Sequence, residues 1–94
     1  MNAPAVGADS RPAIDRGLRL QWEPAQGAYV LLYPEGMIKL NSSAGEILKR
    51  CDGAATIAAI TEDLERAFAT VGLQAEVLQF IGMAVGKRWL EILP

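Results

Sequence analysis

The feature of this sequence that most constrains its fold is a change in hydrophobic periodicity near residue 41. Before this point, apolar residues occur in three short runs that are separated by turn-forming residues. After it, they recur every three or four residues, which is the spacing of an amphipathic helix. The chain has 94 residues, a length that suits one domain with one hydrophobic core. The pattern therefore predicts strands followed by helices within a single small domain.

Three strands are predicted in the first part of the chain. Residues 17–23 alternate between apolar and polar side chains, which is typical of a half-buried strand. Residues 28–33 are a short aliphatic and aromatic run and predict a well-buried strand, and residues 37–40 predict a third strand. The connections at residues 24–27 and 34–36 are rich in proline and glycine and predict tight turns. Consecutive short strands with tight turns indicate an antiparallel meander.

Three helices are predicted in the second part. The run Ser43-Ala44-Gly45-Glu46 fits a capping box at the start of the first helix, and Gly53 ends that helix. The second helix starts near Thr56, a favourable N-cap residue, and stops at Gly72. The third covers about residues 76–89. The apolar faces of the three helices are predicted to be Ala44, Ile47, Leu48 and Cys51; Ile57, Ile60, Leu64, Phe68 and Val71; and Val77, Leu78, Ile81, Ala84, Val85 and Trp89.

The predicted fold class is α+β: an N-terminal three-stranded antiparallel meander followed by three helices, winged-helix-like in its inventory of elements. A three-stranded sheet cannot bury both of its faces alone, so the helices are expected to pack on one side. Residues 1–16 are rich in small and polar residues and include Pro4 and Pro12. We expect them to form a disordered N-terminal arm, followed by a single peptide-recognition domain over residues 17–94.

Composition and charge exclude several classes of function. The formal net charge is −2, whereas nucleic-acid-binding domains usually carry a basic face. The chain contains no histidine, and its single cysteine, Cys51, can form neither an internal disulfide nor a zinc site by itself. Phosphate-binding glycine motifs are also absent from the sequence. We therefore expect a binding module with no catalytic residues, metal or cofactor. Without a secretion signal or a long apolar run, the expected location is the cytoplasm.

Three groups of residues allow a functional interpretation beside a structural one. The carboxylates within residues 62–65 suit the polar face and the first turns of a helix, which favours a structural role. Cys51 lies on an apolar helical face, where a free cysteine is usually a buried hydrophobic residue. Lys87 and Arg88 complement the negative end of the third helix, or they meet acidic residues of a partner.

The third predicted strand is expected to lie at an edge of the sheet. An edge strand presents N–H and C=O groups without partners, and only Lys39 would protect this one with a charge. An extended peptide can add beside such a strand, with main-chain hydrogen bonds giving affinity and side-chain pockets giving specificity. Lys39 can also be sufficient protection by itself, and the same edge can pair with a second copy of the chain.

Several segments, taken in order and spacing, closely resemble the PqqD family of pyrroloquinoline quinone biosynthesis. The resemblance covers about residues 16–90. The segments that carry it are Gly17-Leu18-Arg19-Leu20, Leu31-Leu32-Tyr33-Pro34-Glu35-Gly36, Leu40-Asn41, Ala44, Ile47-Leu48 and Cys51-Asp52-Gly53. Glu76-Val77 matches loosely the acidic residue and valine that often begin the third helix in this family, with Glu where Asp is commoner.

The resemblance implies a function that composition alone does not. PqqD-like proteins bind the ribosomally made precursor peptide of pyrroloquinoline quinone and present it to a radical S-adenosylmethionine (SAM) enzyme, which cross-links a Glu and a Tyr of the peptide. Related recognition domains bind a leader peptide as an additional strand, in the cleft between the third strand and the third helix. Carried onto this chain, with the helix residues chosen by their spacing, the peptide-binding residues are Met37, Ile38, Lys39, Leu40, Val77, Phe80, Ile81, Ala84 and Lys87.

Two other classes of function remain open at this point. A winged-helix nucleic-acid-binding protein would need a basic recognition helix, but the third helix offers only Lys87 and Arg88 near its end. A dimerisation module would use the exposed strand edge and the apolar residues 89–93, which either pack onto the domain or form an interface.

Overall fold

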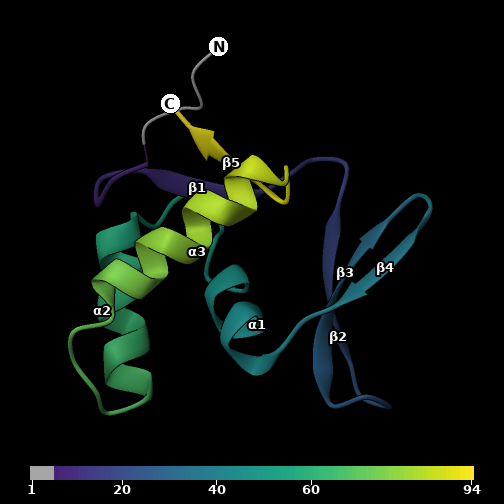
Figure 1. The fold of residues 1–94 in the computed structure, drawn as a ribbon, viewed down its shortest axis with the longest axis horizontal. Coiled ribbons are helices and arrows are strands. Elements are labelled where there is room, and N and C mark those ends of the chain that lie inside the picture. The colour runs from purple at the N-terminus through teal and green to yellow at the C-terminus, as the bar shows by residue number, and fades with distance from the viewer. Residues whose placement is uncertain (1–5) are drawn as a thin grey trace.

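Within residues 6–94, which the computed structural model describes, the strands form two antiparallel sheets and three helices complete the fold (Figure 1). The predicted α+β class, with a meander that precedes three helices, is confirmed. In Figure 1 the meander lies at the right and α2 at the left, with α1 between them. The elements in chain order are β1 (Arg11–Ile14), β2 (Arg19–Glu23), β3 (Ala28–Tyr33), β4 (Gly36–Lys39), α1 (Ser42–Leu48), α2 (Ile57–Ala67), α3 (Gln74–Gly86) and β5 (Leu90–Leu93).

The meander has the strand order β2-β3-β4. Its register places Leu20, Leu31 and Ile38 side by side across the three strands. Because side chains alternate between the faces of a sheet, these three residues share one face. Leu31 belongs to the main core, and Leu20 and Ile38 pack against that core. This face is therefore the one that the helices cover.

All three helices end earlier than predicted. Helix α1 ends at Leu48 and not at Gly53, and α2 ends at Ala67 and not at Gly72, which leaves Val71 outside the helix and 84% exposed. Helix α3 ends at Gly86, so Trp89 follows the helix and is not part of it.

The helix starts follow local capping chemistry, with one correction. The N-cap of α1 is Asn41, whose side-chain oxygen accepts a hydrogen bond from the Ala44 amide at 2.8 Å. The predicted capping box at Ser43 is therefore wrong, because the chain leaves β4 early enough for Asn41 to take the cap position. Thr56 caps α2 as predicted, and its hydroxyl accepts from the Ala59 amide at 3.1 Å.

The hydrophobic core joins all three helices to β3 and β5. Ile57 and Ile60 of α2 and Ile81 of α3 are almost fully buried in it. In the chain, α1 packs against β3, α2 against α3, and α3 against β5. The core members are Leu31, Leu40, Ala44, Ile47, Leu48, Cys51, Ile57, Ile60, Leu64, Val77, Ile81, Ala84 and Leu90.

The two ends of the domain pair with each other in a small sheet that the sequence did not predict. Strand β1 pairs antiparallel with β5, from Arg11 opposite Leu93 to Ile14 opposite Leu90. The predicted disordered arm is therefore wrong for residues 11–14, while residues 1–5 of that arm lie outside the described residues. The physical reason is that a four-residue strand gains its hydrogen bonds from a partner at the other end of the chain. The apolar C-terminal residues thus pack within the domain as β5.

Residues 6–10 also have a structural role at the start of α2. The Ser10 carbonyl accepts a hydrogen bond from the Ile57 amide, and the Ala8 carbonyl accepts from the Ala58 amide, both at 2.9 Å. The first amides of a helix have no partner within the helix itself. This segment therefore supplies the acceptors that Thr56 alone cannot provide. Among residues 6–94, no helix is long and apolar enough to cross a membrane.

Candidate functional site

The candidate site begins at the free edge of β4. Among the described residues, β4 is the last strand of its sheet, so the predicted edge is confirmed. The Leu40 amide donates to the Tyr29 carbonyl at 3.0 Å and therefore faces β3. Successive residues of an antiparallel strand direct their amides alternately to the two sides. The N–H and C=O groups of Met37 and Lys39 consequently point away from β3, toward the free edge.

The side chains of the predicted β4 segment divide between the two faces of the sheet. Ile38 lies on the helix-facing side, where it is partly buried against the core. Met37 is 51% exposed, and Lys39 is also exposed. Leu40 is only 5% exposed and belongs to the core. The edge therefore offers peptide groups at Met37 and Lys39 and an apolar side chain at Ile38.

A pocket of about 370 Å³ lies between the β3–β4 hairpin and the residues that follow α3. It brings together two predicted binding residues from distant parts of the sequence, Ile38 of β4 and Lys87 at the end of α3. We call it the hairpin pocket. Its lining residues are Leu18, Tyr33, Pro34, Glu35, Ile38, Lys87, Arg88 and Trp89.

The aromatic and cationic residues after α3 form one wall of the hairpin pocket. The Lys87 ammonium group lies 5.7 Å from the centre of the Trp89 ring, a cation–π distance. Of these two residues, only Lys87 was predicted for the site. The segment Tyr33 to Glu35 was predicted only as a strand end and a turn. The signal that could have identified this segment is its presence among the residues that carry the family resemblance.

The other predicted residues of α3 lie elsewhere. Val77, Ile81 and Ala84 are at most 2% exposed and belong to the core. Phe80 is partly buried and packs against that core. None of these four residues lines the hairpin pocket. They pack α3 against the core, and the residues that follow this helix line the hairpin pocket.

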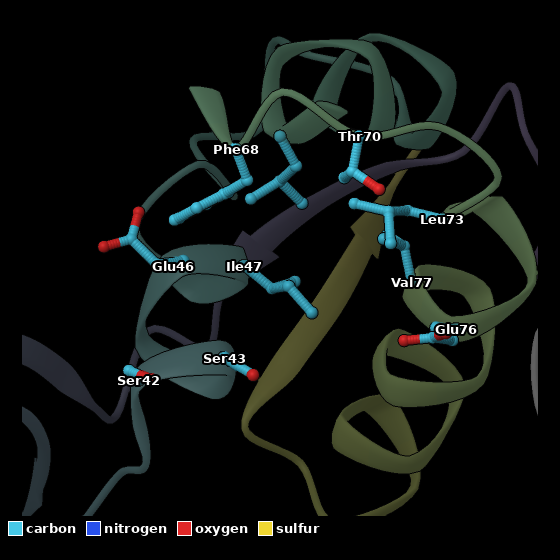
Figure 2. Close-up of a pocket in the computed structure, with 10 residues that line it drawn as sticks. Ser42, Ser43, Glu46, Ile47, Phe68, Thr70, Leu73, Glu76 and Val77 are labelled. Atoms are coloured by element: carbon cyan, nitrogen blue, oxygen red, sulfur yellow. The ribbon is translucent and has the colours of Figure 1, made fainter. Parts of the chain in front are cut away.

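A second pocket, of about 320 Å³, lies among the three helices (Figure 2). Figure 2 shows Ile47 of α1 and Val77 of α3 pointing into it from opposite sides, with Phe68 at its upper edge. Phe68 is 53% exposed, although the sequence predicted it on the apolar face of the second helix. Of the predicted binding residues, only Val77 lines this pocket.

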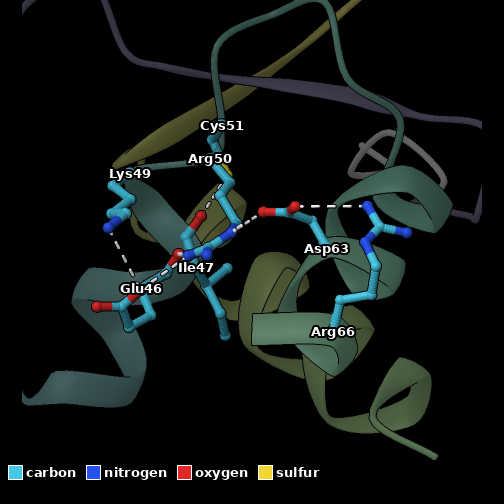
Figure 3. Close-up of polar contacts among 7 residues, drawn as sticks. All are labelled: Glu46, Ile47, Lys49, Arg50, Cys51, Asp63 and Arg66. Carbon is cyan, nitrogen blue, oxygen red and sulfur yellow. Dashed lines mark hydrogen bonds and ion pairs between the residues drawn. The ribbon is translucent and has the colours of Figure 1, made fainter. Parts of the chain in front are cut away.

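A polar cluster joins α1 to α2 and includes the carboxylates of Glu46 and Asp63 (Figure 3). Arg50 donates to Asp63 at 2.6 Å and to the Glu46 carboxylate at 2.8 Å. The hydrogen bond from Arg50 lowers the pKa of Glu46 and also that of Asp63. These carboxylates are thus held ionised by Arg50, which follows α1 and links that helix to α2, and this is a structural role.

Cys51 is buried beside the same cluster (Figure 3). Its thiol donates to the Ile47 carbonyl with a sulfur–oxygen distance of 3.3 Å. Burial, together with the charge of Asp52, raises the pKa of Cys51 to about 12. The thiol is therefore protonated at neutral pH and unsuited to nucleophilic attack. Within residues 6–94, no group of three or more Cys, Asp or Glu residues is arranged to hold a metal ion.

Comparison with known proteins identifies relatives over nearly the whole chain. A PqqA binding protein of Pseudomonas paraeruginosa is 48% identical over 93 residues, which is 98% of this chain and 99% of the relative. A PqqA binding protein of Azotobacter vinelandii is 49% identical over 82 residues, which is 86% of this chain and 89% of the relative.

Two solved structures have a similar fold. One is the solution NMR structure of the PqqD truncation of Methylobacterium extorquens PqqCD, which superimposes with a TM-score of 0.77 at 30% identity. It is described as a functional and stand-alone recognition element for ribosomally synthesized and post-translationally modified peptides (RiPPs). The match covers 97% of this chain and 99% of that one. The crystal structure of PqqD from Xanthomonas campestris gives a TM-score of 0.55 at 30% identity over 93% of this chain and 99% of that one.

The family described as Coenzyme PQQ synthesis protein D (PqqD) matches residues 28–90, from the start of β3 to the start of β5. This range includes the free edge of β4, all three helices and most of the hairpin pocket. Together with the relatives at 48% identity, the match establishes that this chain belongs to the PqqD family.

Proposed function

We propose that this protein is a peptide chaperone that binds the PqqA precursor peptide of pyrroloquinoline quinone biosynthesis as an additional strand on β4. The names of its relatives support the identity of the peptide. The observation that carries the binding mode is the free edge of β4 beside the hairpin pocket. Outward peptide groups at Met37 and Lys39 would give affinity, and the pocket next to Ile38 would receive a side chain of the peptide.

The binding mode can be tested by removing one main-chain donor from the free edge. In Lys39→Pro, residue 39 has no amide proton, and the ladder to β3 is kept because that amide points outward. The control Lys39→Ala also loses the ammonium group but keeps the amide. We expect Lys39→Pro to bind PqqA more weakly than Lys39→Ala in calorimetric titrations, with similar circular dichroism spectra. Equal affinity of the two variants would exclude strand addition at this position.

The next step of the pathway would be presentation of the bound peptide to an enzyme. By the family resemblance, the bound peptide would be presented in the cytoplasm to a radical SAM enzyme that makes the cross-link. This protein would contribute binding and orientation while the enzyme performs the chemistry. The raised pKa and the burial of Cys51 support a non-catalytic role, because they make the thiol of this chain unreactive. In a reconstituted reaction, cross-linking should require this protein and should persist with Cys51→Ala.

A second copy of the chain is the competing occupant of the same edge. Two β4 strands can pair by the same hydrogen bonds that a peptide would use. Sedimentation with and without PqqA distinguishes the two cases. The proposal predicts one copy of this protein per bound peptide, whereas a dimer that the peptide does not dissociate would assign the edge to dimerisation.

A further inference from the structure

Arg88 has a left-handed backbone conformation directly after α3, with φ of 63°. The Trp89 amide donates to the Ala84 carbonyl at 2.9 Å, and the Arg88 amide donates to the Val85 carbonyl at 3.0 Å. These two hydrogen bonds define a Schellman motif, in which the residue at the position of Arg88 is usually glycine. A residue with a β-carbon is sterically disfavoured in this conformation. The arginine therefore occupies a backbone position that glycine would fill with less strain.

The end of α2 provides an internal comparison. Ala69 also has a positive φ, of 51°, and the next amide, that of Thr70, donates to the Glu65 carbonyl at 3.0 Å. The same motif thus ends both helices with a residue other than glycine. Ala69 does not line the hairpin pocket, whereas Arg88 does. Ala69 and Arg88 consequently share the backbone strain but differ in what the side chain can contact.

The positive charges near the hairpin pocket are not engaged in ion pairs within the domain. All nine Lys and Arg residues lie in the described part of the chain, and Arg16, Lys49, Arg50 and Arg66 form ion pairs there. Lys39, Lys87 and Arg88 form none within residues 6–94. The hairpin pocket is also lined by Glu35, so its lining carries two positive charges and one negative charge, and Lys39 adds a further positive charge at the free edge of β4.

We propose that Arg88 is a specificity-determining residue that selects a carboxylate in the bound peptide. This inference rests on the proposed function and adds the chemistry of the segment that enters the site. An apolar side chain of the peptide fills the hairpin pocket, and an acidic residue next to it pairs with the guanidinium group of Arg88. Arginine suits this role because its planar group can bind both oxygens of a carboxylate. The contact offers a functional reason for an arginine in a left-handed position.

The test uses two matched substitutions to glycine, Arg88→Gly and Ala69→Gly. Each removes a β-carbon from a left-handed residue, so both are expected to raise Tm by a few degrees. Only Arg88→Gly is expected to weaken PqqA binding, by about fivefold in Kd at moderate salt, as for one charged contact at the rim of an interface. Its Kd should also depend less on salt concentration than that of the wild type.

The peptide side of the contact is tested with PqqA variants in which single Glu or Asp residues become Gln or Asn. At one position, the substitution should weaken binding to the wild type and have little further effect on Arg88→Gly, as a double-mutant cycle shows for a direct contact. If wild type and Arg88→Gly bind unmodified PqqA with equal affinity and the same salt dependence, the proposed role of Arg88 is overturned, whereas the proposed function is not. A wild-type protein that does not bind PqqA would overturn the proposed function and this inference with it.

Discussion

Gly45 of α1 lies so close to Tyr29 of β3 that a β-carbon on Gly45 would come within 2.9 Å of Tyr29 Cδ2 and 3.2 Å of Tyr29 Cβ. Helix α1 therefore packs directly against β3, the central strand of the meander. This close approach limits how far α1 can shift relative to β3. Only two residues separate β4 from α1, so this contact lies close in the chain to the free edge, although Gly45 is not itself in the site.

Gly45→Ala is expected to destabilise the protein by about 1–3 kcal/mol, because the added methyl group overpacks the contact with Tyr29. The control is Gly82→Ala, also inside a helix, where a β-carbon would have no heavy atom within 4 Å. That substitution should stabilise the protein by roughly 0.5–1 kcal/mol, because alanine favours a helix more than glycine does. Urea unfolding of both variants measures the two effects. A Gly45→Ala variant as stable as Gly82→Ala would contradict the close packing.

A variant that starts at Arg11 tests the role of the segment before β1. It lacks the Ala8 and Ser10 carbonyls, which accept hydrogen bonds from the first amides of α2. We expect the free energy of unfolding to fall by about 1–2 kcal/mol, the range for a lost helix cap. An unchanged urea midpoint would show that these hydrogen bonds do not contribute to stability, as for a disordered arm.

The sequence predicted those elements whose signal is local. The meander and the three helices each carry their own hydrophobic period and turn residues, so their existence and order were predicted, although α1 and α2 end about five residues before their predicted stops. The pairing of β1 with β5 joins the two ends of the chain, and no local pattern reports it. The choice of Asn41 over Ser43 as N-cap depended on where β4 ends, which tertiary packing decides.

The candidate site was predictable to a similar extent. The strand edge followed from the order of the strands, and β4 does lie at the edge. The spacing of apolar residues predicted the apolar stripe of α3 but not which of its residues face the core. The structure shows that Val77, Ile81 and Ala84 are buried in the core. The hairpin pocket combines a turn with the end of α3, so its lining becomes visible only when the two are brought together.

The ion pair between α1 and α2 predicts how stability depends on pH. The pKa values of Glu46 and Asp63 are lowered in the folded protein from ordinary values of 4.5 and 3.8, chiefly by the hydrogen bonds from Arg50. Groups with lowered pKa values contribute stability above those ordinary values, and the contribution is lost as the pH falls below them. The difference in unfolding free energy between wild type and Arg50→Met should therefore be largest near neutral pH and shrink below about pH 5.

Urea titrations of both proteins at several pH values measure this difference. Asp9→Asn serves as a control for a change of charge that breaks no ion pair, because the Asp9 carboxylate forms none within residues 6–94. A difference between wild type and Arg50→Met that stays constant down to pH values below both ordinary pKa values would mean that Arg50 stabilises the protein by packing alone.

Cys51 is expected to resist alkylation in the folded protein. With its pKa raised to about 12 from an ordinary value of 9.0, it has roughly a thousandfold less thiolate at mildly alkaline pH than an unfolded chain. Mass spectrometry after iodoacetamide treatment, with and without urea, compares the two states. Modification of the native protein at the unfolded rate would show that the thiol is exposed and reactive.

The most direct test of the central claim is an NMR titration of ¹⁵N-labelled protein with PqqA, combined with amide hydrogen exchange. Strand addition on β4 predicts chemical-shift changes at residues 36–40 and at Lys87, Arg88 and Trp89. It also predicts slower exchange of the outward amides of Met37 and Lys39 when peptide is bound. Unchanged exchange at both amides in the presence of excess peptide, with shifts confined to the pocket among the three helices or absent altogether, would contradict the claim.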